Sequence, residues 1–209
     1  MDLVEFPPPP SAAPLSRMLF ESPWLFVGVL GAATLFLLVA GLREGRFDRL
    51  KVAAGTGGIA ILLVLVSSLV TTPGEHAKAT VRRFVEAVVA ADATTANSLL
   101  APDVAFHVGD PGNMAFPRDY LASAVEWATS RYAIESNRIR RLDAWTTSDG
   151  RGLVHLGCFT VPATGGPVPT QWVIETSEQP DGSWAIERMT WIGLLGRRPS
   201  GAEIPVRQR

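Results

Sequence analysis

Two long stretches without a charged residue constrain this chain more than any other feature. They run over residues 24–42 and 52–70, and each is 19 residues long. At 1.5 Å of rise per residue, a helix of about 19 residues spans about 28 Å, close to the apolar thickness of a bilayer. Within lipid the backbone groups must be hydrogen-bonded inside the segment, which makes a helix the expected form. The sequence therefore predicts two transmembrane helices in a lipid bilayer, and two buried helices of a soluble protein are the alternative.

The connector between these spans, residues 43–51, is short and basic. Four of its nine residues are Arg or Lys, whereas the leader before the first span contains a single arginine. A connector this short predicts an antiparallel hairpin, and the positive-inside rule places it in the cytoplasm. Both termini and the rest of the chain are then expected on the extracytoplasmic side. The basic residues Lys78, Arg82 and Arg83, soon after the second span, weigh against this orientation.

The segments that flank these parts predict little structure of their own. The leader, residues 1–23, contains the run Pro7–Pro10, which favours an extended polyproline conformation. A spacer and a ligand for a proline-binding partner both remain open for this run. The leader lacks the basic region of a cleavable signal peptide. Residues 71–74 form a linker with a Pro-Gly turn, and residues 196–209 form a basic tail that we expect to be disordered.

Residues 75–195 have the composition and periodicity of a folded domain. Apolar residues first recur at helical spacing, and the pattern predicts helices over 75–91, 92–101 and 117–131, with a short strand over 104–108. Pro102 is expected to end the second helix. The period then changes to two, and Asp-Gly turn signals separate strands over 134–146, 152–161, 168–177 and 183–194. This order predicts an α+β domain whose helices pack on one face of a curved antiparallel sheet.

Several runs in this domain resemble a known superfamily. The runs Phe84-Val-Glu-Ala-Val, Ala91-Asp92 and Ser98 to Phe106 are similar to the opening of NTF2-like domains, which include ketosteroid isomerase and SnoaL-type proteins. The run from Asp181 to Trp191 is similar to their final strand. The resemblance implies a cone-shaped sheet around helices with a pocket between them, and a homodimer paired through the sheet. Since the fold hosts enzymes, binders and assembly modules, it does not choose a function.

Pocket catalysis needs a positioned acid or base, and few residues offer one. The candidates for catalysis are His107, Asp110, His155, Glu175 and Tyr120. Strand alternation places His155 on one face with Leu153 and Phe159. A structural or surface role is open for each candidate, and Asp110-Pro-Gly also has the form of a turn. The catalytic pairs of the superfamily's enzymes cannot be matched here residue by residue, which weighs against isomerase chemistry.

A set of aromatic side chains is expected to point into the domain. They are Phe84, Phe106, Trp127, Trp172 and Trp191. They either fill a core or line a cavity for a small apolar ligand. The first hypothesis is therefore a membrane-anchored, non-catalytic NTF2-like module that binds such a ligand or a protein partner. The second is a membrane-bound SnoaL-type or isomerase-type enzyme with a hydrophobic substrate, and the third is a structural subunit of a membrane complex.

Several functional classes receive no support from the sequence. The formal net charge of -1 gives no footprint for nucleic-acid binding. The single cysteine, Cys158, lies in an apolar run and is expected to be a buried, inert thiol. His107 and His155 have no metal-ligand spacing, so we expect no metal. Neither a glycine-rich phosphate loop nor a serine nucleophile motif occurs, and we expect no cofactor.

Overall fold

A computed structural model describes residues 5–9, 24–69, 71–131 and 134–200. The chain divides into two units, one over Ser11–Thr72 and the other a domain made of Pro73–Arg209 and Met1–Pro10. The first unit contains α2 (Trp24–Glu44) and α3 (Phe47–Leu69). The domain contains, in chain order, α4 (Pro73–Val89), α5 (Ala93–Ser98), β1 (Leu100–Val108), α6 (Arg118–Arg131), β2 (Ile134–Thr146), β3 (Gly152–Pro162), β4 (Val168–Glu178) and β5 (Trp184–Leu194).

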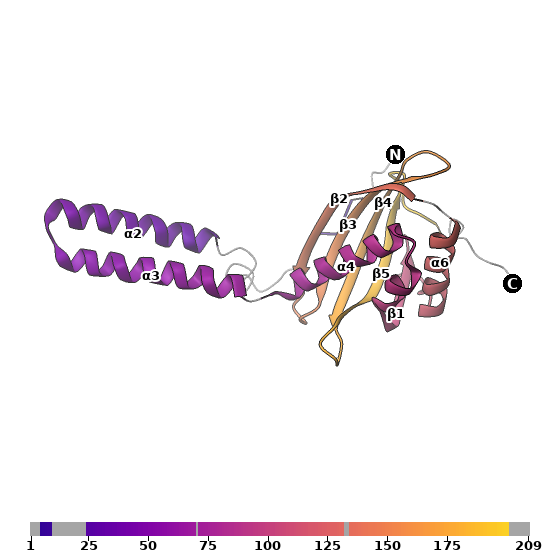
Figure 1. Cartoon of the computed structure of the whole chain (residues 1–209), viewed down its shortest axis with the longest axis horizontal. Helices are drawn as coiled ribbons and strands as arrows, with labels where there is room; N and C mark the ends of the chain where they lie inside the picture. The colour runs from indigo at the N-terminus through magenta and orange to yellow at the C-terminus, as the bar shows by residue number, and fades with distance from the viewer. Residues whose placement is uncertain (1–4, 10–23, 70, 132–133, 201–209) are drawn as a thin grey trace. The chain divides into compact units, whose positions relative to one another are not determined.

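The helices α2 and α3 form an antiparallel pair (Figure 1). Only Gly45 and Arg46 separate them, so most of the residues between the two uncharged runs are helical. Gly45 has φ of +64°, a left-handed conformation that glycine adopts without steric cost. Across the pair, the hydroxyls of Thr34 and Thr56 are 2.9 Å apart and share a hydrogen bond. The predicted hairpin is therefore present.

Most of the apolar surface of this pair has no cover within the unit. Phe36 is 72% exposed and Ile61 is 64% exposed. By length and composition, Phe26–Glu44 and Phe47–Val66 could each cross a membrane. An apolar surface that water would contact in a soluble protein matches the environment that lipid provides. This pattern is the basis of the membrane proposal below.

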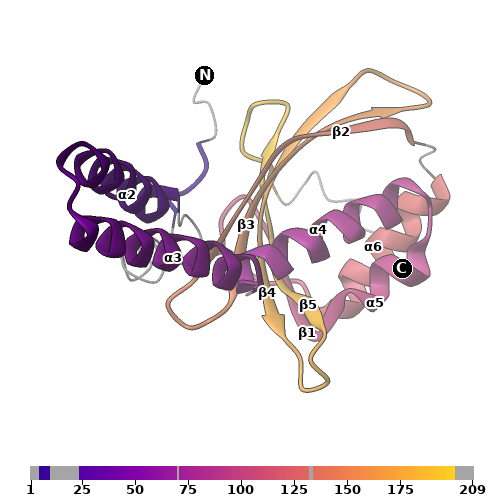
Figure 2. The ribbon, with the colours of Figure 1, turned by 60° about the vertical axis from the view of Figure 1, so that its left-hand side comes forward.

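The domain contains a curved five-stranded sheet with α4, α5 and α6 on one face (Figure 2). The strand order is β1-β5-β4-β3-β2, so β1 and β2 are the edges. The strands from β2 to β5 form the expected antiparallel meander, but β1 pairs with β5 in parallel. The expectation of a wholly antiparallel sheet was wrong at this pair. The alternation of apolar and polar residues along β1 shows which side chains share a face of the sheet. It does not show whether a strand far away in the sequence, such as β5, pairs with β1 in parallel or antiparallel.

The first strand begins earlier than the sequence predicts. We expected a helix to continue to residue 101, but α5 ends at Ser98 and β1 starts at Leu100. Pro102 lies inside β1, where the register with β5 shifts between Leu100 and Ala105. A proline lacks the N–H of a ladder bond and is tolerated at a bulge or on an edge strand. Both conditions hold here, so Pro102 does not mark the end of a helix.

The two faces of the sheet carry different side chains. The helix face, on which α4–α6 pack, presents Val154, Leu156 and Ile174, all of which are buried core residues. The outer face presents the residues between them, including Leu153, His155, Val173 and Glu175. Helix α4 meets the helix face through Ala77, Val81 and Phe84, spaced three or four residues apart as an amphipathic helix requires. The domain thus has the expected α+β class, with helices on a curved, mixed sheet.

The segment after β5 also packs on the domain. Leu194 and Arg197 form a β-bridge, and Pro199 is buried. Arg198 lies 3.6 Å from a carboxylate oxygen of Asp110. Residues 196–200 of the expected tail are therefore placed, while residues 201–209 and most of the leader lie outside the described residues.

Candidate functional site

An apolar cavity of about 650 Å³ lies between the helices and the helix face of the sheet. Its walls come from α4, α6 and strands β2 to β5. Volumes of about 300–1,000 Å³ are typical of small-molecule sites. Four aromatic side chains line it: Phe84, Trp127, Trp172 and Trp191. Two of them, Trp172 and Trp191, stack with ring centroids 5.6 Å apart. The domain therefore holds a space of the size and chemistry that suit an apolar molecule.

Few polar groups reach the cavity. The described lining contains Asn137, Thr160 and Thr170, and the Thr160 hydroxyl donates to Asn137 Oδ1 at 2.8 Å. The Cys158 thiol also lines it, and burial raises the pKa of that thiol. No Asp, Glu, His, Lys, Arg or Tyr occurs among the described residues that line it. The described wall can orient a hydroxyl or carbonyl group, and it offers neither a charge nor an acid–base pair.

Four of the five aromatic residues expected in the pocket line the cavity, and Phe106 does not. Phe106 is buried in the core, with its ring centroid 6.0 Å from that of Phe116 and 6.4 Å from those of Tyr120 and Trp172. The cavity also uses aliphatic residues that sequence reasoning did not single out, such as Leu156, Ile174 and Met189. For Ile174 the sequence did contain a signal, because strand alternation places it on the same face as Trp172.

The histidine candidates do not reach the cavity. From β3 to β1, His155 pairs with Val173 of β4, Val173 pairs with Thr190 of β5, and Thr190 pairs with His107. Residues paired in this way point to the same face, and the face of His155 is the outer one. Three strand spacings of about 4.8 Å separate the two histidines by roughly 14 Å. They form no dyad and face away from the apolar space.

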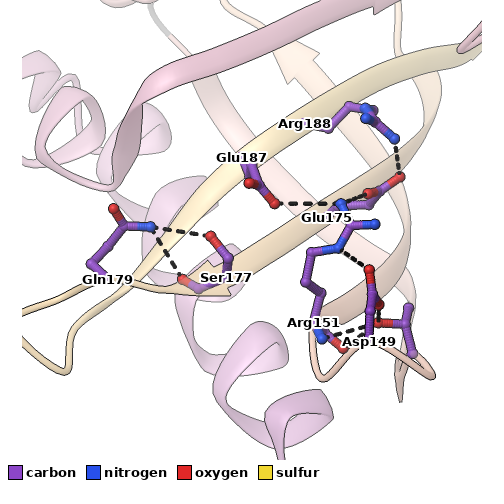
Figure 3. Close-up of polar contacts among 8 residues, drawn as sticks. Asp149, Arg151, Glu175, Ser177, Gln179, Glu187 and Arg188 are labelled. Carbon is purple, nitrogen blue, oxygen red and sulfur yellow. Dashed lines mark hydrogen bonds and ion pairs between the residues drawn. The ribbon is translucent and has the colours of Figure 1, made fainter.

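Glu175 is engaged in ion pairs on the outer face (Figure 3). Its carboxylate accepts a hydrogen bond from Arg151 at 2.8 Å and one from Arg188 at 2.9 Å. Arg151 also reaches Asp149 at 2.7 Å and Glu187 at 3.4 Å. Hydrogen bonds between ionised groups are stronger than neutral ones, so both arginines hold the Glu175 carboxylate in place. This ion-pair cluster links the turn before β3 to β4 and β5, and it supplies no free base.

The last candidates lie near the β1 edge. Tyr120, on α6, packs its ring 4.7 Å from that of Phe116, and burial raises the pKa of its hydroxyl. Asp110 forms the expected turn by accepting from the Gly112 amide at 2.8 Å. Nδ1 of His107 lies 2.9 Å from the Asn113 carbonyl oxygen, which holds the same loop. The described residues contain no group of three or more His, Cys, Asp or Glu side chains suited to a metal ion.

Several solved structures are similar to part of this chain. Similar chains include an NTF2-like protein from Cytophaga hutchinsonii (12% identity, 54% of this chain and 90% of that one, TM-score 0.44). An NTF2-like protein of unknown function from Pseudomonas putida is 13% identical over 56% of this chain and 84% of its own (TM-score 0.48). A ketosteroid isomerase-like protein from Erwinia carotovora atroseptica is 18% identical over 55% and 92% (TM-score 0.42). No family sequence model and no curated protein sequence matches the chain.

Proposed function

We propose that this protein is a membrane-anchored NTF2-like module that binds an uncharged, apolar small molecule in the cavity between α4, α6 and the sheet. The observation that carries the proposal is the cavity wall, which is aromatic and aliphatic and has no charged group among the described residues. A ligand charge placed there would lose its hydration without gaining a partner. An uncharged ligand with a single hydroxyl or carbonyl fits the few polar groups, Asn137 and Thr170 among them.

The membrane anchor is the second part of the proposal. The exposed apolar side chains of α2 and α3 support it, as do the two helical stretches of membrane-spanning length. The arginines and the lysine at the turn of the pair favour a cytoplasmic turn under the positive-inside rule. The test is protease accessibility of the domain in intact cells and in inverted vesicles. Cleavage from the cytoplasmic side would overturn the orientation, and release of the chain by alkaline carbonate would overturn the anchor.

An enzyme of the isomerase type receives less support. Such chemistry needs acid or base groups that converge on one apolar space. The expected candidates lie instead on the outer face, as His107, His155 and Glu175 do, or are absent from the described cavity wall, as Tyr120 is. Binding without catalysis therefore follows more directly from the geometry.

The single cysteine provides a test of ligand binding. Cys158 lines the cavity and also borders a groove on the outer face, whereas strand alternation turns its neighbour Phe159 to the outer face. With the full chain in detergent micelles at pH 8, we expect 1-dodecanol to slow the reaction of Cys158 with N-ethylmaleimide at least about fivefold. This corresponds to occupancy of about 80% or more if bound ligand blocks the thiol.

The matched control moves the thiol by one residue. In a Cys158→Ala, Phe159→Cys variant the thiol lies on the other face of the same strand, in the same micelle. We expect 1-dodecanol to leave its alkylation rate unchanged. Equal protection at both positions would show an effect of the micelle, and no protection at Cys158 would count against the cavity as a ligand site.

A further inference from the structure

A second feature lies on the face of the sheet that the helices leave open. Residues 5–9, which we call the strap, pack there, opposite α4 and α6 (Figure 2). Phe6 stacks on His155 with ring centroids 4.8 Å apart and planes inclined by 22°. The guanidinium carbon of Arg141 lies 4.4 Å from the centre of the Phe6 ring. Phe6 is thus held between an imidazole and a cation.

Phe6 is the anchor of the strap. Its side chain is half-buried, whereas Glu5 and Pro7–Pro9 are exposed. A groove of about 610 Å³ runs between the prolines and the sheet, beside Arg140, Gly157 and Pro169. The prolines therefore pack loosely, and one aromatic contact holds the segment. Removal of that contact would free the strap without disturbing the helix face.

His155 is unusual for a residue on this face. It is 0% exposed, although α4, α5 and α6 lie on the other face of the sheet. The Trp145 ring approaches edge-on at 4.7 Å, and the stacked Phe6 ring closes the site. Neither ring nitrogen has a hydrogen-bond partner among the described residues. Burial of unpaired polar atoms opposes closure of the strap, because water would satisfy both nitrogens when Phe6 leaves.

The charged groups around His155 also affect which form of the imidazole the closed site accepts. Burial, together with the positive charge of Arg141, lowers the pKa of His155 to about 4, and Asp143 opposes this shift in part. Arg141 and Asp143 come from β2 and pair with each other at 2.7 Å. From β4 the facing residue is Val173, which is uncharged, and Glu5 is the charged residue of the strap. The closed site therefore accepts a neutral imidazole and disfavours a protonated one.

We propose that residues 5–9 form a pH-gated strap: Phe6 closes over His155 while the imidazole is neutral, and it leaves when the imidazole takes up a proton. One proton from solvent binds at each opening. A hydrated imidazole has a reference pKa of about 6.5, so the closed state loses stability as the pH falls below that value. Between pH 7.5 and 4.5 the ratio of closed to open strap should fall by at most about 70-fold, because Arg141 stays beside the open imidazole. Opening exposes the Phe6, Trp145 and His155 surface and frees the proline run.

The first test uses the three histidines of the chain, which give a simple spectrum after selective ¹³C labelling. In the full chain in detergent micelles, we expect His155 to titrate well below pH 6. Phe6→Ala should raise its pKa by at least about one unit, because water then reaches the ring. Phe159→Ala, which changes another phenylalanine of the same face, should leave it unchanged. An unchanged pKa in Phe6→Ala would overturn the proposal.

The second test follows the strap itself. A spin label at Pro8→Cys, in a Cys158→Ala background, should be immobile at pH 7.5 and gain a mobile component at pH 4.5. Adding His155→Leu should keep the label immobile at both values, since leucine supports Phe6 and cannot take up a proton. The same mobility at both pH values without His155→Leu, or the same gain with it, would overturn the gate. Circular dichroism at pH 4.5 confirms that the domain is folded in each sample.

Discussion

The two faces of one sheet carry opposite chemistry, although the same strands build both. On β4, Trp172 and Ile174 face the helices and the apolar cavity, whereas Val173 and Glu175 face outward among charges. Every acid or base candidate placed on a strand lies on the outer face. The difference teaches that the proposed ligand site and the titratable groups lie on separate faces: the cavity wall is apolar, and the charged side chains and His155 are on the outer face.

The largest expected effect is a loss of folding stability from a substitution on the helix face of the sheet. Ile174→Ala removes a side chain that is 1% exposed, and loss of its burial plus the cavity it leaves should cost about 2–5 kcal/mol. The neighbouring Val173→Ala, on the outer face, should cost about 1 kcal/mol. Chemical unfolding of the full chain in detergent micelles, followed by tryptophan fluorescence, measures both. Equal losses would remove the distinction between the two faces.

The next effect is a pH dependence that belongs to the outer face. The pKa of His155 is lowered to about 4 in the folded chain, against about 6.5 when unfolded. The unfolded chain therefore binds more protons between these values, so stability is complete above pH 6.5 and is lost as the pH falls toward 4. By pH 4.5 the loss is at most about 2.5 kcal/mol, less if the strap opens first. His155→Leu should remove this share from the unfolding profile, while the carboxylates titrate as before.

A smaller effect should come from the ion-pair cluster. Glu175 has a side chain that is 17% exposed and pairs with two arginines. Glu175→Gln should cost about 1 kcal/mol, because Arg151 and Arg188 lose a shared partner, and the loss should shrink at high salt. The exposed Glu178 gives a control, and Glu178→Gln should change the free energy of unfolding by less than about 0.5 kcal/mol. A salt-independent loss would indicate packing in place of charge.

The smallest effect concerns the polar groups of the cavity. Thr160→Val removes the hydroxyl that donates to Asn137 and keeps the branched shape. It should cost about 0.5 kcal/mol, the lower end for one hydrogen bond. Thr160→Ser, which keeps the hydroxyl, is the control and should retain the bond. If Thr160→Val stabilises the chain, the pair does not contribute as the distance suggests.

Much of the fold could be predicted because it is encoded locally. The uncharged runs, the helical face of α4 and the alternation of β2 to β5 are patterns within single elements. The start of β1 and its parallel pairing with β5 could not be predicted from the sequence. Both depend on a partner strand about 85 residues away, as the pairing of Ala105 with Arg188 shows. Pro102 was taken as a helix end because its tolerance on an edge strand is a tertiary property.

For the candidate site, too, features encoded within one strand could be predicted, and features that depend on distant contacts could not. Alternation was enough to group Trp172 with Thr170 and Ile174, which line the cavity, and His155 with Leu153 on the other face. It could not say which face the helices cover. The burial of His155 was also beyond the sequence, because it comes from Phe6, a residue of the leader almost 150 positions earlier.

The strap has a consequence for the proposed membrane anchor. Residues 5–9 precede both long helices, and the sheet that they touch follows them. If α2 and α3 cross the bilayer as we propose, two crossings return the chain to the side it left, and Phe6 can then reach His155. Deletion of either helix alone would leave Phe6 and His155 on opposite sides of the bilayer, so an even number of crossings is needed for the strap to close.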